Sequence, residues 1–267
     1  MNHSEILQYW LTLGCAITLC AFVFARRLHR SLFFFSTYAY LLLASTACLW
    51  IVYEHFGFHS LISYYAYWAS VFVFLAARTA AVAELCLHVL RAYRGIWNLA
   101  WRALSVLVLL FLVHAAFDSW GQTNRLALYG LILERDLDMV SVAILAILLL
   151  IRNYYGLALS HVQKNIAFGL LFLGSTRIIN NTILRNLFAG RLSSWFQVES
   201  ATDLWSVIDI YSLLISTGIW CFALRKSLPE AIVKPALLPA EIYREMSPAI
   251  NVRLSAFNDR LARLLKP

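Results

Sequence analysis

Several polar and ionisable residues lie within long apolar stretches of this sequence, where a charged group is costly. Arg78 and Arg177 each lie inside an apolar run, and so do His114, Asn181 and Asp209. A charge near the centre of a lipid bilayer costs at least about 2.5 kcal/mol on insertion scales, so such residues turn inward and pair. The chemistry open to them is ion pairing, hydrogen bonding or the binding of a charged ligand.

Helical spacing groups these side chains on common faces. Arg177, Asn181 and Arg185 follow one another at intervals of four, and residues four apart are neighbours on a helix. We expect Arg177 or Arg185 to pair with Asp209. This is the leading predicted ion pair.

A second set of contacts is predicted for the other two runs. We expect Arg78 to pair with Asp118 or Asp209. His114 and Asp118 are also four apart, so they can share a face and hydrogen-bond.

At 1.5 Å per residue, these residues lie between the bilayer midplane and its outer half, roughly 18–24 Å from the cytoplasmic ends of their runs. This polar layer is either a satisfied network that sets helix register or a ligand cavity. In a cavity, the arginines would favour an anionic small ligand. The ligand-site candidates are Arg78, His114, Asp118, Arg177, Asn181, Arg185 and Asp209.

Glu84 and His88 form a separate candidate pair below Arg78 on the same run, residues 62–91. A run of roughly 29 residues is about 43 Å long as a helix, which exceeds a hydrocarbon core of about 30 Å. The run would join the polar layer to the cytoplasmic face. We therefore predict that Glu84 and His88 couple the two, as a signalling element requires.

Composition places these residues on membrane-spanning helices. Apolar residues make up 61% of the 267 residues and charged residues 13%, with a mean hydropathy of +0.71. Soluble domains carry about 25% charged residues. The apolar runs are continuous, which is typical of helices rather than of barrel strands. We predict an all-α membrane protein, a bundle of seven transmembrane helices over residues 6–24, 32–53, 62–91, 103–120, 139–151 with an extension over 154–159, 166–188 and 204–224.

Residues 119–138 are expected to form a loop, because their apolar piece, residues 126–133, is too short to cross a membrane. Basic residues gather after the first, third, fifth and seventh predicted spans, whereas the other side has only Arg125, Arg135 and Arg191. The positive-inside rule then places the N-terminus outside and the C-terminus in the cytoplasm.

Residues 1–228 are expected to form the transmembrane domain and residues 229–267 a cytoplasmic tail. Apolar residues at intervals of three and four predict a short basic amphipathic helix in the tail. This helix suits the anionic inner leaflet, the chain's own helices or a partner protein. Partners are thus the lipid bilayer, and either a second copy of the chain or a cytoplasmic protein at the tail.

Other function classes are disfavoured. The net charge of +8 comes from basic residues that flank apolar runs, as topology requires, so no nucleic-acid binding is predicted. The five cysteines lie inside apolar runs and form no CxxC motif, which argues against a zinc site. No nucleophile, base and orienting group occur together. We expect no metal, cofactor or catalytic residue, and an enzyme is the least favoured class.

Three segments resemble a group of uncharacterised bacterial multi-pass membrane proteins: YYAYW at Tyr64 to Trp68, Glu84 within AVAELCLHVLRAYRG, and the tail segment YREMSPAINVRLSAFNDRL. The resemblance spans much of the chain and implies a bacterial inner membrane, without an activity. Rhodopsins and G-protein-coupled receptors share only the predicted topology, because no lysine lies within residues 204–224 to bind retinal and no Asn-Pro-x-x-Tyr motif occurs there.

These observations favour a sensory or regulatory membrane protein that binds a ligand in its polar layer, or responds to the membrane, and signals through its cytoplasmic face. A small-solute transporter or channel and a non-catalytic scaffold subunit are the alternatives. A cavity connected to both faces would favour transport, a cavity open only outward would favour sensing, and a filled, paired core would favour a scaffold.

Overall fold

The computed structural model describes residues 3–57, 60–90, 94–121, 124–155, 159–188 and 198–225, with isolated tail positions 252, 256, 259, 260 and 263. These residues form seven α-helices and one short 3-10 helix, without a strand, which confirms the all-helical prediction. The elements are α1 (His3–Ala25), η1 (Leu28–Arg30), α2 (Phe33–Phe56), α3 (Leu61–Leu90), α4 (Arg94–Asp118), α5 (Arg125–Tyr155), α6 (His161–Phe188) and α7 (Val198–Arg225). The predicted tail helix lies almost wholly outside the described residues.

Five of these helices are long and apolar enough to cross a membrane, which indicates a multi-pass membrane protein. Their spanning segments are Phe33–Phe56, Leu61–Leu90, Asn98–Asp118, His161–Asn186 and Leu204–Arg225. The first helix, α1, has a shorter apolar segment, Tyr9–Ala25. The fifth, α5, is long, but Glu134, Arg135, Asp136 and Asp138 interrupt its first half.

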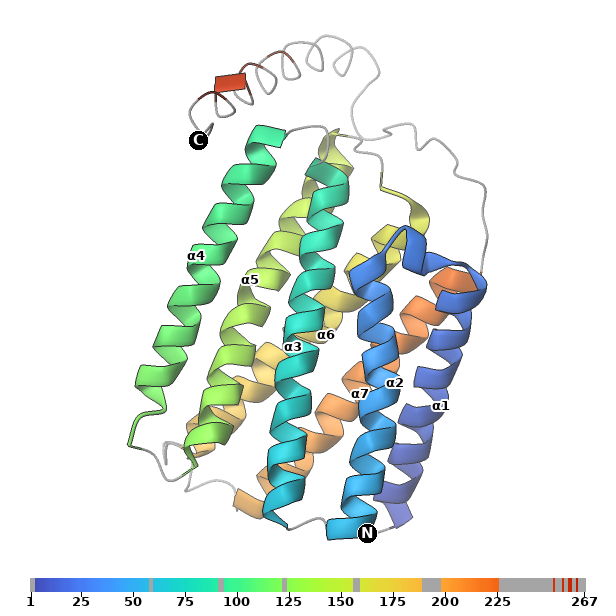
Figure 1. Ribbon diagram of the computed structural model, residues 1–267, viewed down its shortest axis with the longest axis vertical. Helices are drawn as coiled ribbons and strands as arrows, with labels where there is room; N and C mark the ends of the chain where they lie inside the picture. The colour runs from blue at the N-terminus through green and yellow to red at the C-terminus, as the bar shows by residue number, and fades with distance from the viewer. Residues whose placement is uncertain are drawn as a thin grey trace.

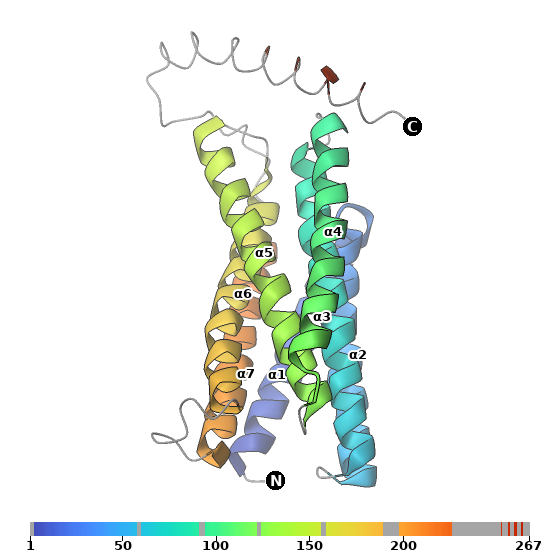
Figure 2. The ribbon, with the colours of Figure 1, turned by 90° about the vertical axis from the view of Figure 1, so that its left-hand side faces the viewer.

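Successive helices run in opposite directions (Figure 1). The pairs α6–α7, α5–α6 and α2–α3 pack most extensively, and α1 joins the set by packing against both α2 and α7. In the turned view, α5, α6 and α7 lie on one side and α2, α3 and α4 on the other, and α5 tilts away from α4 toward the upper end (Figure 2). The fourth helix is peripheral, because it packs mainly on α5 and only slightly on α3.

Two charged side chains, one in α3 and one directly after α1, satisfy the ends of other helices. The Glu84 carboxylate in α3 accepts hydrogen bonds from the backbone N–H groups of Phe34 and Phe35, at 2.9 and 3.1 Å, in the first turn of α2. Arg26 donates to the carbonyls of Leu224 and Arg225 at the end of α7, at 3.1 and 3.0 Å. A carboxylate at a helix N-terminus and a guanidinium at a C-terminus both suit the helix dipole. These contacts fix α2 on α3 and α7 on α1.

The largest described core cluster draws on α1, α2, α3, α5, α6 and α7 and includes Trp220, which is fully buried. Its indole donates to the carbonyl of Ile166 at 3.2 Å and meets Phe35 and Tyr38 edge-on. The indole fits because Gly169 has no side chain: a Cβ there would lie 2.2 Å from Trp220 Nε1. The small residue therefore sets how closely α6 approaches α7.

Candidate functional site

The segment predicted as a loop is helical, and this is the main correction to the sequence-based topology. Residues 125–138 form the first half of an unbroken helix, α5, that continues to Tyr155. Four charged residues within five positions indicated exposure, but Glu134, Asp136 and Asp138 are all buried. Their carboxylates face basic groups on other helices or on α5 itself, so the charges stay inside the protein rather than in water.

Five charged residues from four helices form one group, three of them buried and two partly buried, which we term the ion cluster. Its members are Arg78 of α3, Glu134 and Asp138 of α5, Arg177 of α6 and Asp209 of α7.

Glu134 is the hub of the ion cluster. Its Oε1 accepts from Arg78 Nη2 at 3.2 Å and from Arg177 Nη1 at 2.7 Å. Its Oε2 accepts from the amide of Asn181 at 3.0 Å, and Trp205 of α7 donates to the Asn181 carbonyl oxygen at 2.9 Å. Both oxygens of the hub carboxylate are therefore satisfied, and the polar layer continues through Asn181 onto α7.

Each of the two arginines has one buried nitrogen without a hydrogen-bond partner. Arg177 also faces Asp209, with Nη2 donating to Oδ2 at 3.0 Å and Nε 2.7 Å from Oδ1, out of line for a hydrogen bond. Arg78 Nη2 is shared between Glu134 and Asp138 Oδ1, which lies 2.8 Å away. Arg78 Nη1 and Asp138 Oδ2 are buried without any hydrogen-bond partner.

Of the three predicted contacts, one is correct and two are wrong. The leading pair, Arg177 with Asp209, is present. Arg78 pairs with Glu134 and Asp138 of α5, and not with Asp118 or Asp209. The prediction failed because residues 119–138 were expected to form a loop, which left both α5 carboxylates out of consideration. Arg185, the alternative partner in the first prediction, pairs with Asp118 instead.

His114 does not hydrogen-bond to Asp118. Its Nδ1 lies 2.9 Å from Oδ2 of Asp136 on α5, and the other oxygen of Asp136 accepts from Arg135 at 2.7 Å. The His114 and Asp118 side chains each reach across to another helix instead. Together with the Asp118–Arg185 pair, this contact ties the C-terminal end of α4 to α5 and α6.

Glu84 and His88 do not interact through their side chains. Glu84 is buried and caps α2, while His88 Nδ1 lies 2.9 Å from the backbone carbonyl of Glu84 within its own helix. The Glu84 contact holds α2 on α3, whereas the His88 contact lies within α3. The coupling role of these two residues stays a prediction.

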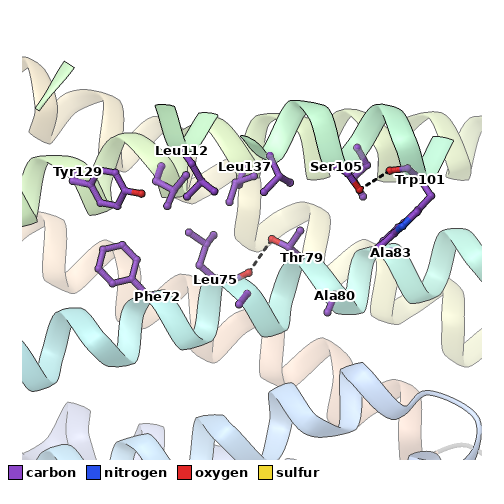
Figure 3. Close-up of a pocket in the computed structure, with 14 residues that line it drawn as sticks. Phe72, Leu75, Thr79, Ala80, Ala83, Trp101, Ser105, Leu112, Tyr129 and Leu137 are labelled. Atoms are coloured by element: carbon purple, nitrogen blue, oxygen red, sulfur yellow. Dashed lines mark hydrogen bonds between the residues drawn. The ribbon is translucent and has the colours of Figure 1, made fainter. Parts of the chain in front are cut away.

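An apolar pocket lies between α3, α4 and α5, beside the ion cluster (Figure 3). Its volume is about 640 Å³. Leu75 and Thr79 of α3 line it on either side of Arg78 in the sequence, and Leu133 and Leu137 of α5 similarly bracket Glu134. Trp101 and Ser105 of α4 lie at one end of the pocket and Tyr129 at the other (Figure 3).

Sequence reasoning missed three carboxylates, Glu134, Asp136 and Asp138, although a local signal was present. Glu134 and Asp138 are four apart, so on a helix they share a face, and apolar residues precede and follow them. A loop assignment hides this relation, because spacing of four has a meaning only on a helix.

Comparison of the chain with known protein families, curated proteins and solved structures finds no match. The ion cluster and the pocket are therefore interpreted from their geometry.

Proposed function

We propose that this chain is a sensory or regulatory protein of a bacterial inner membrane, with seven spans, an outer N-terminus and a cytoplasmic tail. In this proposal its ligand enters the pocket between α3, α4 and α5, and its tail passes the response to the cytoplasmic side. The observation that carries the proposal is the position of the pocket, between the most sparsely packed helix and the two helices that carry Arg78, Glu134 and Asp138.

The fourth helix has the packing of a movable element. Among its described side chains, residues 98–118, only Ala115 is fully buried. His114 and Asp118 tie its C-terminal end to α5 and α6, whereas Trp101, Leu104 and Ser105 of its N-terminal half line the pocket. A ligand that fills the pocket can therefore displace the N-terminal half of α4 about its fixed end.

The walls of the pocket also connect it to the ion cluster. Leu133 and Leu137 lie one residue from Glu134 and Asp138 on α5, so a displacement of these leucines moves the carboxylates that hold Arg78 and Arg177. Because interfaces of this kind have discrete arrangements rather than a continuum, a small shift at the pocket can change how α3, α5 and α6 pack. This is the coupling that a sensor needs.

The chemistry of the pocket favours an amphiphile with an apolar chain and an anionic headgroup. The lining is almost entirely apolar, with Thr79, Ser105 and Trp101 toward the end where α4 begins. The basic residues of the predicted cytoplasmic rim suit an anionic headgroup at that end. A small anion alone would have to displace Glu134, Asp138 or Asp209 from the arginines.

Photolabelling tests the site. We expect a photoactivatable palmitate analogue to label peptides of α3, α4 or α5 that line the pocket. Ala80→Phe, which fills the pocket, should reduce this labelling at least several-fold, whereas Ala69→Phe, on the same helix outside the pocket, should leave it unchanged. Equal labelling in the wild type and in Ala80→Phe would contradict the pocket as a ligand site.

The sensory role needs a second measurement, since binding alone does not signal. Spin labels at the exposed positions Leu99 of α4 and Leu150 of α5, in a chain without its native cysteines, report the separation of the two helices. We expect palmitate to change the distance distribution, and Ala80→Phe to abolish the change. Binding without any change in distance would contradict the sensory function.

A small-solute transporter is the second candidate function, and one observation favours it. Buried ionisable groups inside membrane proteins often belong to ion or proton pathways, and Arg78 Nη1 and Asp138 Oδ2 have no partner. Liposomes that contain the purified chain and a pH-sensitive dye distinguish the two functions. A proton-coupled transporter would dissipate an imposed pH gradient when its solute is added, whereas a sensor would preserve the gradient under all conditions.

A further inference from the structure

We infer that the ion cluster binds one proton, held on Asp138. This inference is independent of the sensory proposal, because it depends on the charges of the ion cluster and not on the pocket. The first observation is the number of charges: two guanidinium groups, Arg78 and Arg177, face the three carboxyl groups of Glu134, Asp138 and Asp209. Fully ionised, the ion cluster would carry one unbalanced negative charge.

An unbalanced charge inside a membrane protein is costly. Removing one partner from a buried ion pair destabilises a protein strongly, because an uncompensated charge is left away from water. A proton or a metal cation would restore neutrality. The described residues contain no group of three or more His, Cys, Asp or Glu side chains arranged for a metal ion. The two guanidinium groups interleaved with the carboxylates would also repel a cation, so the proton is the better occupant.

The hydrogen bonds show which carboxyl group holds the proton. Glu134 accepts from Arg78, Arg177 and Asn181 and is the group best stabilised as an anion. Asp209 contacts Arg177 through both oxygens and has a side chain that is 28% exposed. Asp138 has only the shared Nη2 of Arg78 on one oxygen, no partner on the other, and a side chain that is 2% exposed.

A carboxyl group with few donors and little contact with solvent is the one that favours its neutral form. The charged groups around Asp138 are Arg78 on α3, Glu134 on α5, Arg177 on α6 and Asp209 on α7, and the phenol of Tyr38 on α2 also interacts with it. The α4 groups His114 and Asp118 are engaged with Asp136 and Arg185, so they do not balance the ion cluster. Protonation of Asp138 leaves two cations facing two anions.

Close packing leaves the Asp138 side chain only 2% exposed. Gly174 of α6 lies against the Asp138 side chain: a Cβ there would lie 4.0 Å from Asp138 Cβ and 2.8 Å from Val142. Because residue 174 has no side chain, the Asp138 side chain lies directly against the backbone of α6 at this position. The proton is buried between α3, α5 and α6, and it is exchangeable only when these helices separate.

Infrared spectroscopy of the full-length purified protein tests the inference directly. A protonated carboxyl group has a carbonyl-stretch band that a carboxylate lacks. We expect one such band at neutral pH in the wild type, and we expect it to shift when aspartate carries carbon-13 in its side-chain carboxyl group. The isotope shift identifies an aspartate without any substitution, so the result does not depend on the folding of a variant.

Three variants then locate the proton. The band should disappear in Asp138→Asn and persist in Asp136→Asn, whose carboxylate belongs to the separate contact with Arg135 and His114. In Asp209→Asn the ion cluster has one carboxylate fewer, so Asp138 should ionise and the band should vanish at a lower pH than in the wild type. Absence of the band in the wild type at neutral pH, or its persistence in Asp138→Asn, would overturn the inference.

Discussion

At the scale of single residues, the buried arginines depend on carboxylates that lie far away in the sequence. Arg177 is a link between Glu134 and Asp209 and thereby joins α5 to α7 through α6. Its loss would leave Arg78 as the one guanidinium in the ion cluster. Arg185, two turns further along α6, contacts an aspartate whose side chain is 38% exposed. Arg177 and Arg185 of the same helix are therefore expected to contribute very differently to the free energy of unfolding.

The prediction is that Arg177→Gln lowers the free energy of unfolding by about 3–5 kcal/mol, because it leaves buried carboxylates without a cation. Arg185→Gln, the matched control, should cost less than about 1 kcal/mol, since exposed ion pairs contribute little. Denaturant unfolding of both variants in the same mixed micelles measures the difference. Equal losses would show that the ion cluster does not stabilise the fold as its contacts imply.

At the scale of helices, the distance between packed helices depends on small residues as much as on apolar ones. Gly169 lets the Trp220 indole lie directly on α6. Gly130 of α5 likewise makes room for Trp68 of α3, because a Cβ at Gly130 would lie 2.4 Å from the indole ring. Gly218, on the same helix as Trp220, has no neighbouring atom within 4 Å of such a Cβ. The sequence does not distinguish these glycines, although Gly169 and Gly130 lie against indole rings and Gly218 faces open space.

We predict that Gly169→Ala lowers stability by about 1–3 kcal/mol, because the rigid indole must move out of a filled core. Gly218→Ala should instead be neutral or stabilising by up to about 1 kcal/mol, through the higher helix propensity of alanine. Thermal unfolding followed by tryptophan fluorescence compares them. A stabilising effect of Gly169→Ala would mean that α6 and α7 are further apart than the structure places them.

At the scale of the whole molecule, the distribution of basic residues predicts how the chain lies in its membrane. The turn between α1 and α2 contains Arg26, Arg27 and Arg30, whereas the turn between α4 and α5 has only Arg125 nearby. The positive-inside rule places the first turn in the cytoplasm and the second outside. The helix directions make these two turns lie at opposite ends of the protein (Figure 1).

Single cysteines test this orientation. In a chain without native cysteines, Asn124→Cys should react with a membrane-impermeant maleimide in intact cells, and His29→Cys only after permeabilisation. Both positions are exposed, so failure to react reports the side of the membrane rather than burial. The reverse pattern would place the N-terminus inside and contradict the orientation in the proposed function.

The helical class, the approximate positions of most helices and several intramembrane polar residues are predictable from the pattern of residues along the chain. Continuous apolar runs allow only helices in lipid, because every backbone group must be satisfied within its own segment. The same reasoning marked Arg78, Arg177 and Asp209 as buried groups in need of partners, and it found the Arg177–Asp209 pair. These results follow from local chemistry and from the cost of charge in a membrane.

The partners of Arg78, His114 and Arg185 depend on how the helices pack against one another. The charged half of α5 has the composition of a loop, and its carboxylates are stable inside the protein because basic groups on α3, α4 and α6 face them. Glu84 likewise acts through the backbone of α2, which no side-chain spacing reveals. A buried charge is stabilised by groups that are distant in the chain, so its partners are defined only once the helices have packed.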